Sequence, residues 1–333
     1  MSNVLVTGGA GYIGSHAVLA LLDAGHRPVV LDNLVTGFAE AVPEGVPLIR
    51  ASTADAAEVE NALREHGIDA VMHFAASLLV GESVTDPLKY WGNNVGGTQS
   101  LLRACVAAGV DRFVFSSTAA AYGMTGEEPV AEDAPTRPIN PYGLSKLATE
   151  WMLGDVARAH GLSAVVLRYF NVAGADPRGR AGQRTRNATH LVHVAAEAAA
   201  GTRPEVVIHG TDYPTPDGTC IRDYIHVSDL AAAHVDAIGY LDGGGASETL
   251  NCGYGVGRSV REVLDTVSAV HGRPLPVREG PRRPGDPPRI VARADRIRDV
   301  LGWTPRHDDL RGIVRSAMEW ERRLRAGNGG PAT

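Results

Sequence analysis

The chain has 333 residues, of which 44% are hydrophobic and 21% charged, and its formal net charge is −6. No apolar run approaches the roughly 18 residues that a membrane span needs. A net-negative chain also has no general attraction for nucleic acid or anionic membranes. Its three cysteines are an odd number without C-x-x-C spacing, which argues against a disulfide framework and a zinc site. We therefore expect no metal, no nucleic-acid partner and no membrane partner.

The N-terminus runs from Met1 directly into the apolar stretch Val4 to Val6, without a basic segment or a small-residue cleavage site. A secretory signal would need both features, so we expect a cytoplasmic protein. The length suits one large α/β domain with a second, smaller lobe. Only two of the 32 basic residues are lysines, Lys89 and Lys146. In a chain that otherwise uses arginine, this indicates positions where arginine does not serve in place of lysine.

Short apolar runs alternate with alanine- and leucine-rich stretches over the first half, the pattern of strand–helix–strand units in a parallel sheet. The predicted strands are Val4–Val6, Pro28–Leu31, Ala70–His73, Arg112–Ser116 and Ala164–Tyr169. The predicted helices between them are Tyr12–Ala24, Ala56–Glu65, Leu88–Ala108 and Pro141–Ala159. The pattern predicts an α/β fold, with a doubly wound parallel (Rossmann) sheet and a smaller C-terminal α/β substrate lobe.

The pattern loosens in the second half. The stretch Gly174–Asn187 holds four arginines, three glycines and a proline, which predicts a mobile surface loop. Later helices are expected at Ser228–Ile238, Val260–His271 and Leu310–Arg323. We expect a dinucleotide-binding domain over residues 1–172, a substrate-binding lobe over 173–325, with some segments able to return to the first domain, and a flexible tail over 326–333.

A glycine-rich turn follows the first predicted strand and precedes the first predicted helix. It reads Thr7-Gly8-Gly9-Ala10-Gly11-Tyr12-Ile13-Gly14 and satisfies G-x-G-x-x-G. Residues without a Cβ let the backbone approach a pyrophosphate at the free N–H groups of a helix start. Asp32 follows 21 residues after Gly11, where a carboxylate can bind the ribose hydroxyls of NAD and would repel the 2′-phosphate of NADP. The expected cofactor is therefore NAD.

A tyrosine and a lysine occupy one face of a predicted helix start. Asn140 and Pro141 suit the N-cap and the first helical position, so Tyr142 lies in the first turn and Lys146 four residues later. A phenol with a pKa of about 10 is a poor base at neutral pH. A helix N-terminus and a nearby ammonium both favour the phenolate. We therefore predict that Tyr142 is a catalytic acid/base and that Lys146 tunes it.

One more polar residue lies where a predicted strand ends. Thr118 follows Phe115-Ser116-Ser117, at the sheet edge where ligands bind in such folds. Its hydroxyl is a candidate for a hydrogen bond to a reacting hydroxyl. On composition alone, a role as a cap for the following loop is equally compatible with this position.

Together with these residues, further motifs resemble the UDP-glucose 4-epimerases of the extended short-chain dehydrogenase/reductase family. The resemblance runs from the first strand to about Trp303 and rests on TGGAGYIGSH (Thr7–His16), LDNL (Leu31–Leu34), HFAA (His73–Ala76), VGESV (Val80–Val84), NNVGGT (Asn93–Thr98), SSTAAAYG (Ser116–Gly123), NPYGLSK (Asn140–Lys146), RYFNVAGA (Arg168–Ala175), DYPTPDGTCIRDYIHVSDLA (Asp212–Ala231) and RRPGD (Arg282–Asp286). The Asp212–Ala231 block is the motif most specific to these epimerases.

The resemblance implies an isomerase that interconverts UDP-glucose and UDP-galactose. Tyr142 would take the proton of the sugar 4-hydroxyl, NAD would hold the C4 hydride, and the 4-keto sugar would rotate before the hydride returns to its other face. The implied catalytic residues are Tyr142, Lys146 and Thr118. The implied NAD contacts are Gly8, Gly11, Tyr12, Ile13, Gly14, Asp32, Asn33, Phe74, Ala75, Ala76, Asn93, Ser116, Tyr142, Lys146 and Phe170.

The same resemblance implies a UDP-sugar site and a homodimer. The implied residues of the UDP-sugar site are Thr118 and Tyr142 at the 4-hydroxyl, Asn171 beside the sugar, Arg222 and Arg283 at the diphosphate, Asp286 at the uridine ribose, and Ile290 at the position whose bulk controls acceptance of N-acetylated sugars. Isoleucine is intermediate in bulk, so the acetamido preference stays open. The homodimer would form through the helices Leu88–Ala108 and Pro141–Ala159. The Arg-rich loop Gly174–Asn187 is a candidate to close over the phosphates.

Three other functions remain as alternatives. An epimerase for UDP-N-acetylhexosamines would share every motif above. A 4,6-dehydratase or a uronic-acid decarboxylase would normally carry a carboxylate just after Thr118, where this chain has Ala119-Ala120-Ala121. A catalytically silent NAD-binding regulator would need the glycine turn but not both Tyr142 and Lys146.

Overall fold

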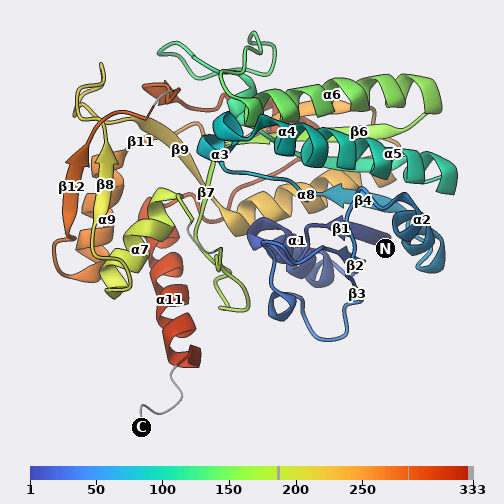
Figure 1. Ribbon diagram of the computed structural model, residues 1–333, viewed down its shortest axis with the longest axis horizontal. Coiled ribbons are helices and arrows are strands. Elements are labelled where there is room, and N and C mark those ends of the chain that lie inside the picture. Colours follow the sequence, from blue (N-terminus) through green and yellow to red (C-terminus); the bar gives the residue numbers. More distant parts are fainter. Residues whose placement is uncertain (186–187, 284, 329–333) are drawn as a thin grey trace.

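A computed structural model describes residues 1–185, 188–283 and 285–328. Its centre is a seven-stranded sheet in the order β10-β6-β5-β4-β1-β2-β3 (Figure 1). All of its neighbouring strands are parallel. The strands are β1 (Asn3–Thr7), β2 (Arg27–Leu31), β3 (Leu48–Ile49), β4 (Ala70–His73), β5 (Arg112–Thr118), β6 (Ser163–Tyr169) and β10 (Glu248–Cys252). The predicted parallel α/β sheet is confirmed, and the five predicted strands are β1, β2, β4, β5 and β6.

Helices cover both faces of this sheet, because side chains along each strand alternate between two apolar cores. Val4 and Val6 of β1 belong to the core under α1 (Tyr12–Asp23) and α8 (Val227–Asp242). Leu5 between them belongs to a separate core under α2 (Ala56–Glu65), α5 (Gly97–Ala108) and α6 (Pro141–His160). This arrangement is the doubly wound fold that the sequence predicted.

A smaller group of elements lies beside the carboxyl end of the sheet (Figure 1). It contains one sheet of β11 (Gly257–Ser259), β9 (Ile221–His226), β13 (Arg289–Ile290) and β7 (Asn171–Ala173), and a strand pair of β12 (Val277–Gly280) and β8 (Val206–His209). Helices α7 (Leu191–Ala200), α9 (Val260–His271) and α11 (Leu310–Asn328) pack against one another there. Strand β10, helix α8 and the adjoining α10 (Asp295–Leu301) return to the large sheet from the second half of the chain. The domain boundaries given above stay a prediction.

The predicted helix Leu88–Ala108 is confirmed, but it is not a regular α-helix throughout. The structure divides it into α4 (Pro87–Tyr90), a π-helical turn η2 (Trp91–Gly96) and α5. Three glycines in WGNNVGG weaken the regular helix, and Asn94 turns inward to donate from Nδ2 to the Ser145 hydroxyl at 3.0 Å and the Ser77 carbonyl at 3.0 Å. A short helix, α3 (Val80–Thr85), precedes this region.

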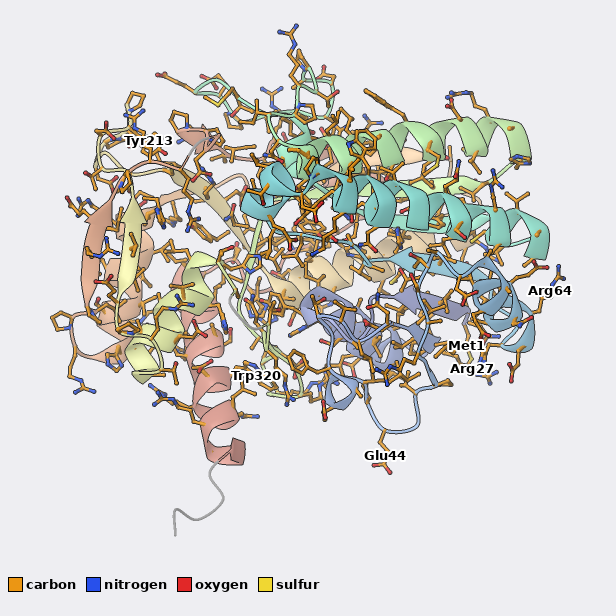
Figure 2. The ribbon with its side chains drawn as sticks, viewed as in Figure 1. Met1, Arg27, Glu44, Arg64, Tyr213 and Trp320 are labelled. Atoms are coloured by element: carbon orange, nitrogen blue, oxygen red, sulfur yellow. The ribbon has the colours of Figure 1, made fainter. Side chains whose placement is uncertain are left out.

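The Arg-rich stretch after β7 is irregular, as predicted, but the expectation of a mobile surface loop was wrong. Ala175, Ala181 and Gln183 are buried, and Trp320 of α11 donates from Nε1 to the Gln183 carbonyl at 3.0 Å (Figure 2). Arg186 and Asn187 lie outside the described residues. At the C-terminus, α11 continues through the first three residues of the predicted tail to Asn328, and residues 329–333 lie outside the described part.

Across the described ranges, none of the helices has both the length and the apolar character that crossing a membrane requires.

A buried ion pair joins α6 to the sheet. Arg168 of β6 donates from Nε to Glu150 of α6 at 3.0 Å, and its Nη2 contacts the other carboxylate oxygen at 2.5 Å. Both side chains are less than 10% exposed, and the Ser117 hydroxyl also donates to Glu150. Because the pair lies one helical turn beyond Lys146, it fixes the orientation of the helix that carries the predicted catalytic residues.

We expect Glu150→Gln to lower the free energy of unfolding by about 3–5 kcal/mol, because it leaves the Arg168 guanidinium buried without its counter-charge. Urea denaturation measures the loss. Glu60→Gln is the matched control: Glu60 pairs with Arg64 on the exposed face of α2, so its loss should stay below about 0.5 kcal/mol. Equal losses for the two variants would contradict the assignment of a structural ion pair.

Candidate functional site

The glycine turn between β1 and α1 is packed so closely that side chains are excluded at most of its positions. A Cβ on Gly14 would lie 2.1 Å from the Gly8 carbonyl oxygen, and one on Gly8 would lie 2.7 Å from the Ala75 nitrogen. Gly8 also has a φ of +71°, which disfavours L residues. The turn therefore holds the end of β1, the start of α1 and the loop after β4 in close contact.

The N-terminus of α1 is open for an anion. Gly11 is its N-cap and supplies no side-chain hydrogen bond to the first turn. A Cβ on Gly11 would meet only the Gly8 carbonyl, at 3.2 Å, so Gly11 is the least crowded glycine of the turn. The N–H groups of Tyr12 and Ile13 follow at this helix start, where the helix dipole is positive. This is the physical arrangement that binds the pyrophosphate of a dinucleotide.

Asp32 closes β2 beside this turn. Its Oδ2 accepts from the Ala10 N–H at 3.1 Å and its Oδ1 from the Leu34 N–H at 2.8 Å. Burial raises the pKa of this carboxyl, and the two backbone N–H groups oppose that rise. The carboxylate is thus fixed beside the turn and keeps lone pairs for further donors. The residues present fit a dinucleotide without a 2′-phosphate.

The first turn of α6 lies directly against the end of β5. Asn140 Oδ1 caps the helix by accepting from the Gly143 N–H at 2.9 Å, and Pro141 occupies its first position, as predicted. A Cβ on Gly143 would lie 2.6 Å from the Ala120 carbonyl oxygen, so only glycine permits this approach. The approach brings Tyr142 beside Thr118, whose hydroxyl lowers the pKa of the phenol while burial, the larger effect, raises it.

Lys146 is buried below Tyr142. It is 3% exposed, its Nζ donates to the Ser116 carbonyl at 2.9 Å, and the ammonium lies 4.9 Å from the centre of the Phe115 ring. Burial lowers the pKa of Lys146 to about 7, and the carboxylate of Glu150 opposes this shift. Two further ammonium hydrogens remain for ligand oxygens.

The geometry corrects one part of the sequence prediction. We expected the helix N-terminus and the ammonium to bring the Tyr142 pKa towards neutrality. In the structure the pKa of Tyr142 is raised, with burial as its largest cause and the Thr118 hydroxyl as the only opposing one. The reason is the burial of the phenol, and Lys146 hydrogen-bonds to the Ser116 carbonyl.

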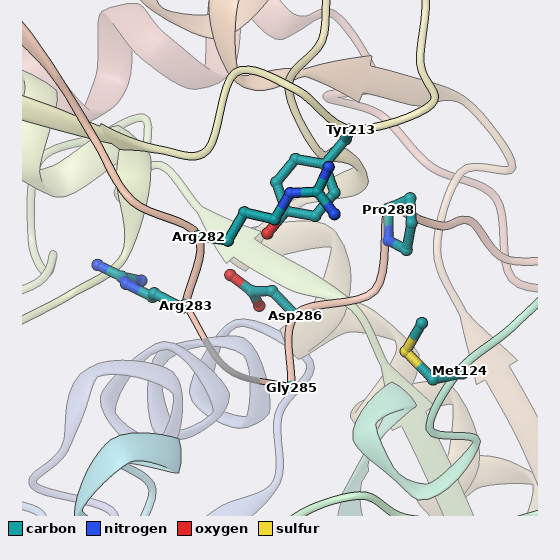
Figure 3. A pocket seen from close by; sticks show the side chains of 7 residues that line it. All are labelled: Met124, Tyr213, Arg282, Arg283, Gly285, Asp286 and Pro288. Carbon is teal, nitrogen blue, oxygen red and sulfur yellow. The ribbon is translucent and has the colours of Figure 1, made fainter.

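A cavity lies in the smaller lobe, beside the loop that joins β12 to β13. Its volume is about 350 Å³, and its lining includes Arg283, Asp286 and Tyr213 (Figure 3). Arg282 stacks over the Tyr213 ring at 4.3 Å from its centre. Arg222 donates from Nη2 to Asp286 at 3.4 Å. Arg283 and Asp286 therefore line this cavity and Arg222 is joined to it through Asp286, while Gly285 lies against Ile139, next to the α6 cap.

The remaining predicted contacts to NAD and the UDP-sugar lie on several different elements. Phe74, Ala75 and Ala76 are half-buried in the loop after β4, and Asn33 is exposed after Asp32. Asn93 lies in η2 and donates from Nδ2 to the Ser77 hydroxyl at 3.1 Å. Phe170 and Ile290 are buried within the apolar core, and Asn171 begins β7.

Sequence reasoning missed a buried polar path behind the site. His73 at the end of β4 lies between the hydroxyls of Thr7, at 2.6 Å, and Thr98, at 2.8 Å. The Thr98 hydroxyl donates to the Asn94 carbonyl, and Asn94 reaches Ser145 in the first turns of α6. The motifs HFAA and NNVGGT contain these residues, but only the fold shows that they connect the glycine turn with the catalytic helix.

Comparison with known proteins agrees with this geometry. Residues 4–253 match the NAD dependent epimerase/dehydratase family. A UDP-glucose 4-epimerase from Azospirillum brasilense is 60% identical over 321 residues, which cover 96% of this chain and 92% of that protein. A crystal structure of UDP-glucose 4-epimerase from Brucella ovis in complex with NAD has a TM-score of 0.93 and 46% identity, and covers 96% of this chain and 98% of its own.

A further crystal structure, of UDP-glucose 4-epimerase from Bifidobacterium longum in complex with NAD+ and UDP, has a TM-score of 0.93 and 37% identity, and covers 98% of this chain and all of its own. Similarity of this extent over nearly whole chains shows both the fold and the family of this chain. The chain therefore belongs to the NAD dependent epimerase/dehydratase family, within its UDP-glucose 4-epimerases.

Proposed function

We propose that the chain is an NAD-dependent isomerase that interconverts UDP-glucose and UDP-galactose by transient oxidation at sugar C4. The observation that carries this proposal is the buried group formed by Tyr142, Thr118 and Lys146 at the carboxyl edge of a sheet whose first turn suits a pyrophosphate. The relatives from Azospirillum brasilense and Brucella ovis, named as UDP-glucose 4-epimerases, support the same activity.

NAD supplies the acceptor and donor of the C4 hydride when it is bound. The open start of α1 would hold its pyrophosphate, and Asp32 its adenosine ribose. Lys146 keeps two hydrogens for ribose hydroxyls after its bond to Ser116. Phe74 to Ala76, Asn93 and Phe170 are our proposed lining of the remaining groove. The NAD in the Brucella ovis structure supports this assignment.

Tyr142 is the proposed acid/base for the sugar 4-hydroxyl. Its phenol oxygen accepts the hydroxyl proton as the carbonyl forms at C4 and returns that proton when the alcohol is restored. The Thr118 hydroxyl favours the charged form of the phenol, since its hydrogen bond lowers the Tyr142 pKa. Ala119 to Ala121, which follow Thr118, offer no carboxylate to drive an elimination.

The cavity in the smaller lobe is the proposed site for the nucleotide. Two phosphates on a chain of net charge −6 need fixed cations, which Arg222 and Arg283 supply. Asp286 already accepts from Arg222, so we propose that its carboxylate keeps that guanidinium in place and also contacts the uridine ribose. The UDP in the Bifidobacterium longum structure supports a nucleotide at such a site. Ile290 and Asn171 are proposed neighbours of the sugar.

We propose that the reaction takes place in the cytoplasm, with the chain as a homodimer. The three cysteines are all free and buried, as suits a reducing compartment. Large apolar side chains are exposed on α4, η2 and α6, which pack against one another. Leu88 is 80% exposed and Trp151 is 59% exposed, and an uncovered apolar surface of this kind marks an interface.

We expect Tyr142→Phe to lower kcat by about 10²–10⁴-fold, because the variant lacks the group that accepts the 4-hydroxyl proton. Chromatographic quantification of UDP-glucose formed from UDP-galactose measures the change, and the variant should retain NAD. Tyr240→Phe is the control, since Tyr240 lies on α8, away from the site. A Tyr142→Phe enzyme as active as the parent would rule out this acid/base. A 6-deoxy product from the parent would indicate a dehydratase instead.

We expect Trp151→Glu to convert the dimer into a monomer, because it places a charge on an apolar interface. Light scattering coupled to size-exclusion chromatography measures the mass in solution. Val277→Glu serves as the control: Val277 is 44% exposed on β12, outside the proposed interface, and its variant should stay dimeric. An unchanged dimer with Trp151→Glu would show that α6 does not form the interface.

A further inference from the structure

The first turn of α1 is hydrogen-bonded to the segment of residues 174–183, which begins directly after β7. The Tyr12 hydroxyl donates to the Gly174 carbonyl at 2.7 Å. His16, one turn further along α1, accepts at Nε2 from the Asp176 N–H at 3.1 Å. These two contacts join the turn that would bind the pyrophosphate to the strand that carries Asn171, although more than 150 residues separate them in sequence.

The hydrogen-bond partners of His16 indicate which ring nitrogen carries its hydrogen. Its Nδ1 lies 2.7 Å from the Tyr12 carbonyl, which can only accept, so Nδ1 carries the hydrogen. Its Nε2 accepts the Asp176 N–H at 3.1 Å, and the Ala181 carbonyl accepts the same N–H at 2.9 Å. Burial lowers the pKa of His16 to about 4, with an opposing contribution from the Tyr12 carbonyl. The imidazole is neutral at physiological pH and acts as a fixed link between two backbone groups.

The segment is itself fixed to the smaller lobe. Gly174 has a φ of +92°, and a Cβ there would lie 2.8 Å from the His226 ring and 3.0 Å from the Ser316 hydroxyl. The Ala175 N–H donates to that hydroxyl at 3.2 Å. Gly174 is therefore enclosed by α1, β9 and α11 together, and its position is set by all three.

The same segment also holds the far end of α1. Arg180 donates to Asp23, the last residue of α1, at 2.9 and 3.0 Å, and to Asp176 at 2.9 Å. Arg178 contacts Asp23 as well. A helix of 12 residues is roughly 18 Å long, so these two arginines lie far from the glycine turn. Arg178 and Arg180 thus bind the opposite end of α1 in this structure, and closure of the loop over the phosphates of the nucleotide sugar stays a prediction.

We propose that Tyr12 and His16 are positioning residues that lock the pyrophosphate-binding turn to the smaller lobe. Residues 174–183 hold α1 at both ends, so the N–H groups of its first turn keep one orientation for the dinucleotide. Loss of either link lets the turn move, which weakens dinucleotide binding without removing any group that touches the sugar. The inference rests on the proposed NAD-dependent function.

The test is the rate of NAD release from the purified holoenzyme, followed by exchange against labelled NAD. We expect Tyr12→Phe to release NAD roughly fivefold faster, the effect of one lost hydrogen bond. Release within a factor of two of the parent rate would overturn the proposal. A holoenzyme that contains no NAD would instead refute the proposed function, so the two failures are distinguishable.

Tyr122→Phe is the matched control for a purely structural hydroxyl. The buried Tyr122 hydroxyl donates to Asn251 of β10 at 2.6 Å, so this variant should melt at a lower temperature with an unchanged rate of NAD release. At His16, glutamine retains a donor and an acceptor whereas leucine has neither. We expect His16→Gln to release NAD more slowly than His16→Leu. Equal release by these two variants would contradict a role for the hydrogen bonds of His16.

Discussion

A buried ammonium group at the carboxyl edge of the sheet is the constraint on which the site depends. Lys146 has one protein acceptor, the Ser116 carbonyl at the end of β5, and an aromatic ring beneath it. An isolated charge in such surroundings is costly, which is why its pKa falls to about 7. The nearby Glu150 carboxylate opposes that fall but is committed to Arg168. Ligand oxygens that accept hydrogen bonds from Lys146 would therefore stabilise its charged form. Binding of the dinucleotide is in this way linked to the protonation of the lysine beside Tyr142.

The parallel sheet explains how distant residues reach this point. Strands β1, β4 and β5 end at one edge, so the glycine turn, the loop after β4 and Thr118 converge there. Helix α6 joins them because Asn140 and Pro141 start it and Gly143 lets it approach Ala120. The polar path through His73 and Asn94 then connects the turn and the helix from behind. Residues 174–183 add a second connection, from α1 to the lobe that would hold the nucleotide.

Much of this architecture could be predicted from the sequence, because local signals specify it. The strands of the large sheet, the glycine turn and the capped start of α6 follow from apolar pattern, glycine spacing and the Asn-Pro pair. The π-helical turn at Trp91–Gly96 could not, since the sequence does not show that the Asn94 side chain turns inward to bind Ser145. The buried Gly174–Gln183 segment has the composition of a loop, and only tertiary partners such as Asp23 and Trp320 show that it is packed. The raised pKa of Tyr142 likewise depends on burial in three dimensions.

The most direct measurement is an NMR titration of Lys146 in the ligand-free protein. With two lysines in the chain, selective ¹³C labelling at lysine Cε gives two signals, and a Lys89→Arg variant identifies the one from Lys146. The account predicts that this signal titrates near pH 7, as burial at the Ser116 carbonyl requires. Titration in the ordinary lysine range, at about pH 10.4, would contradict it. That result would mean that the ammonium lies in water and cannot organise the site.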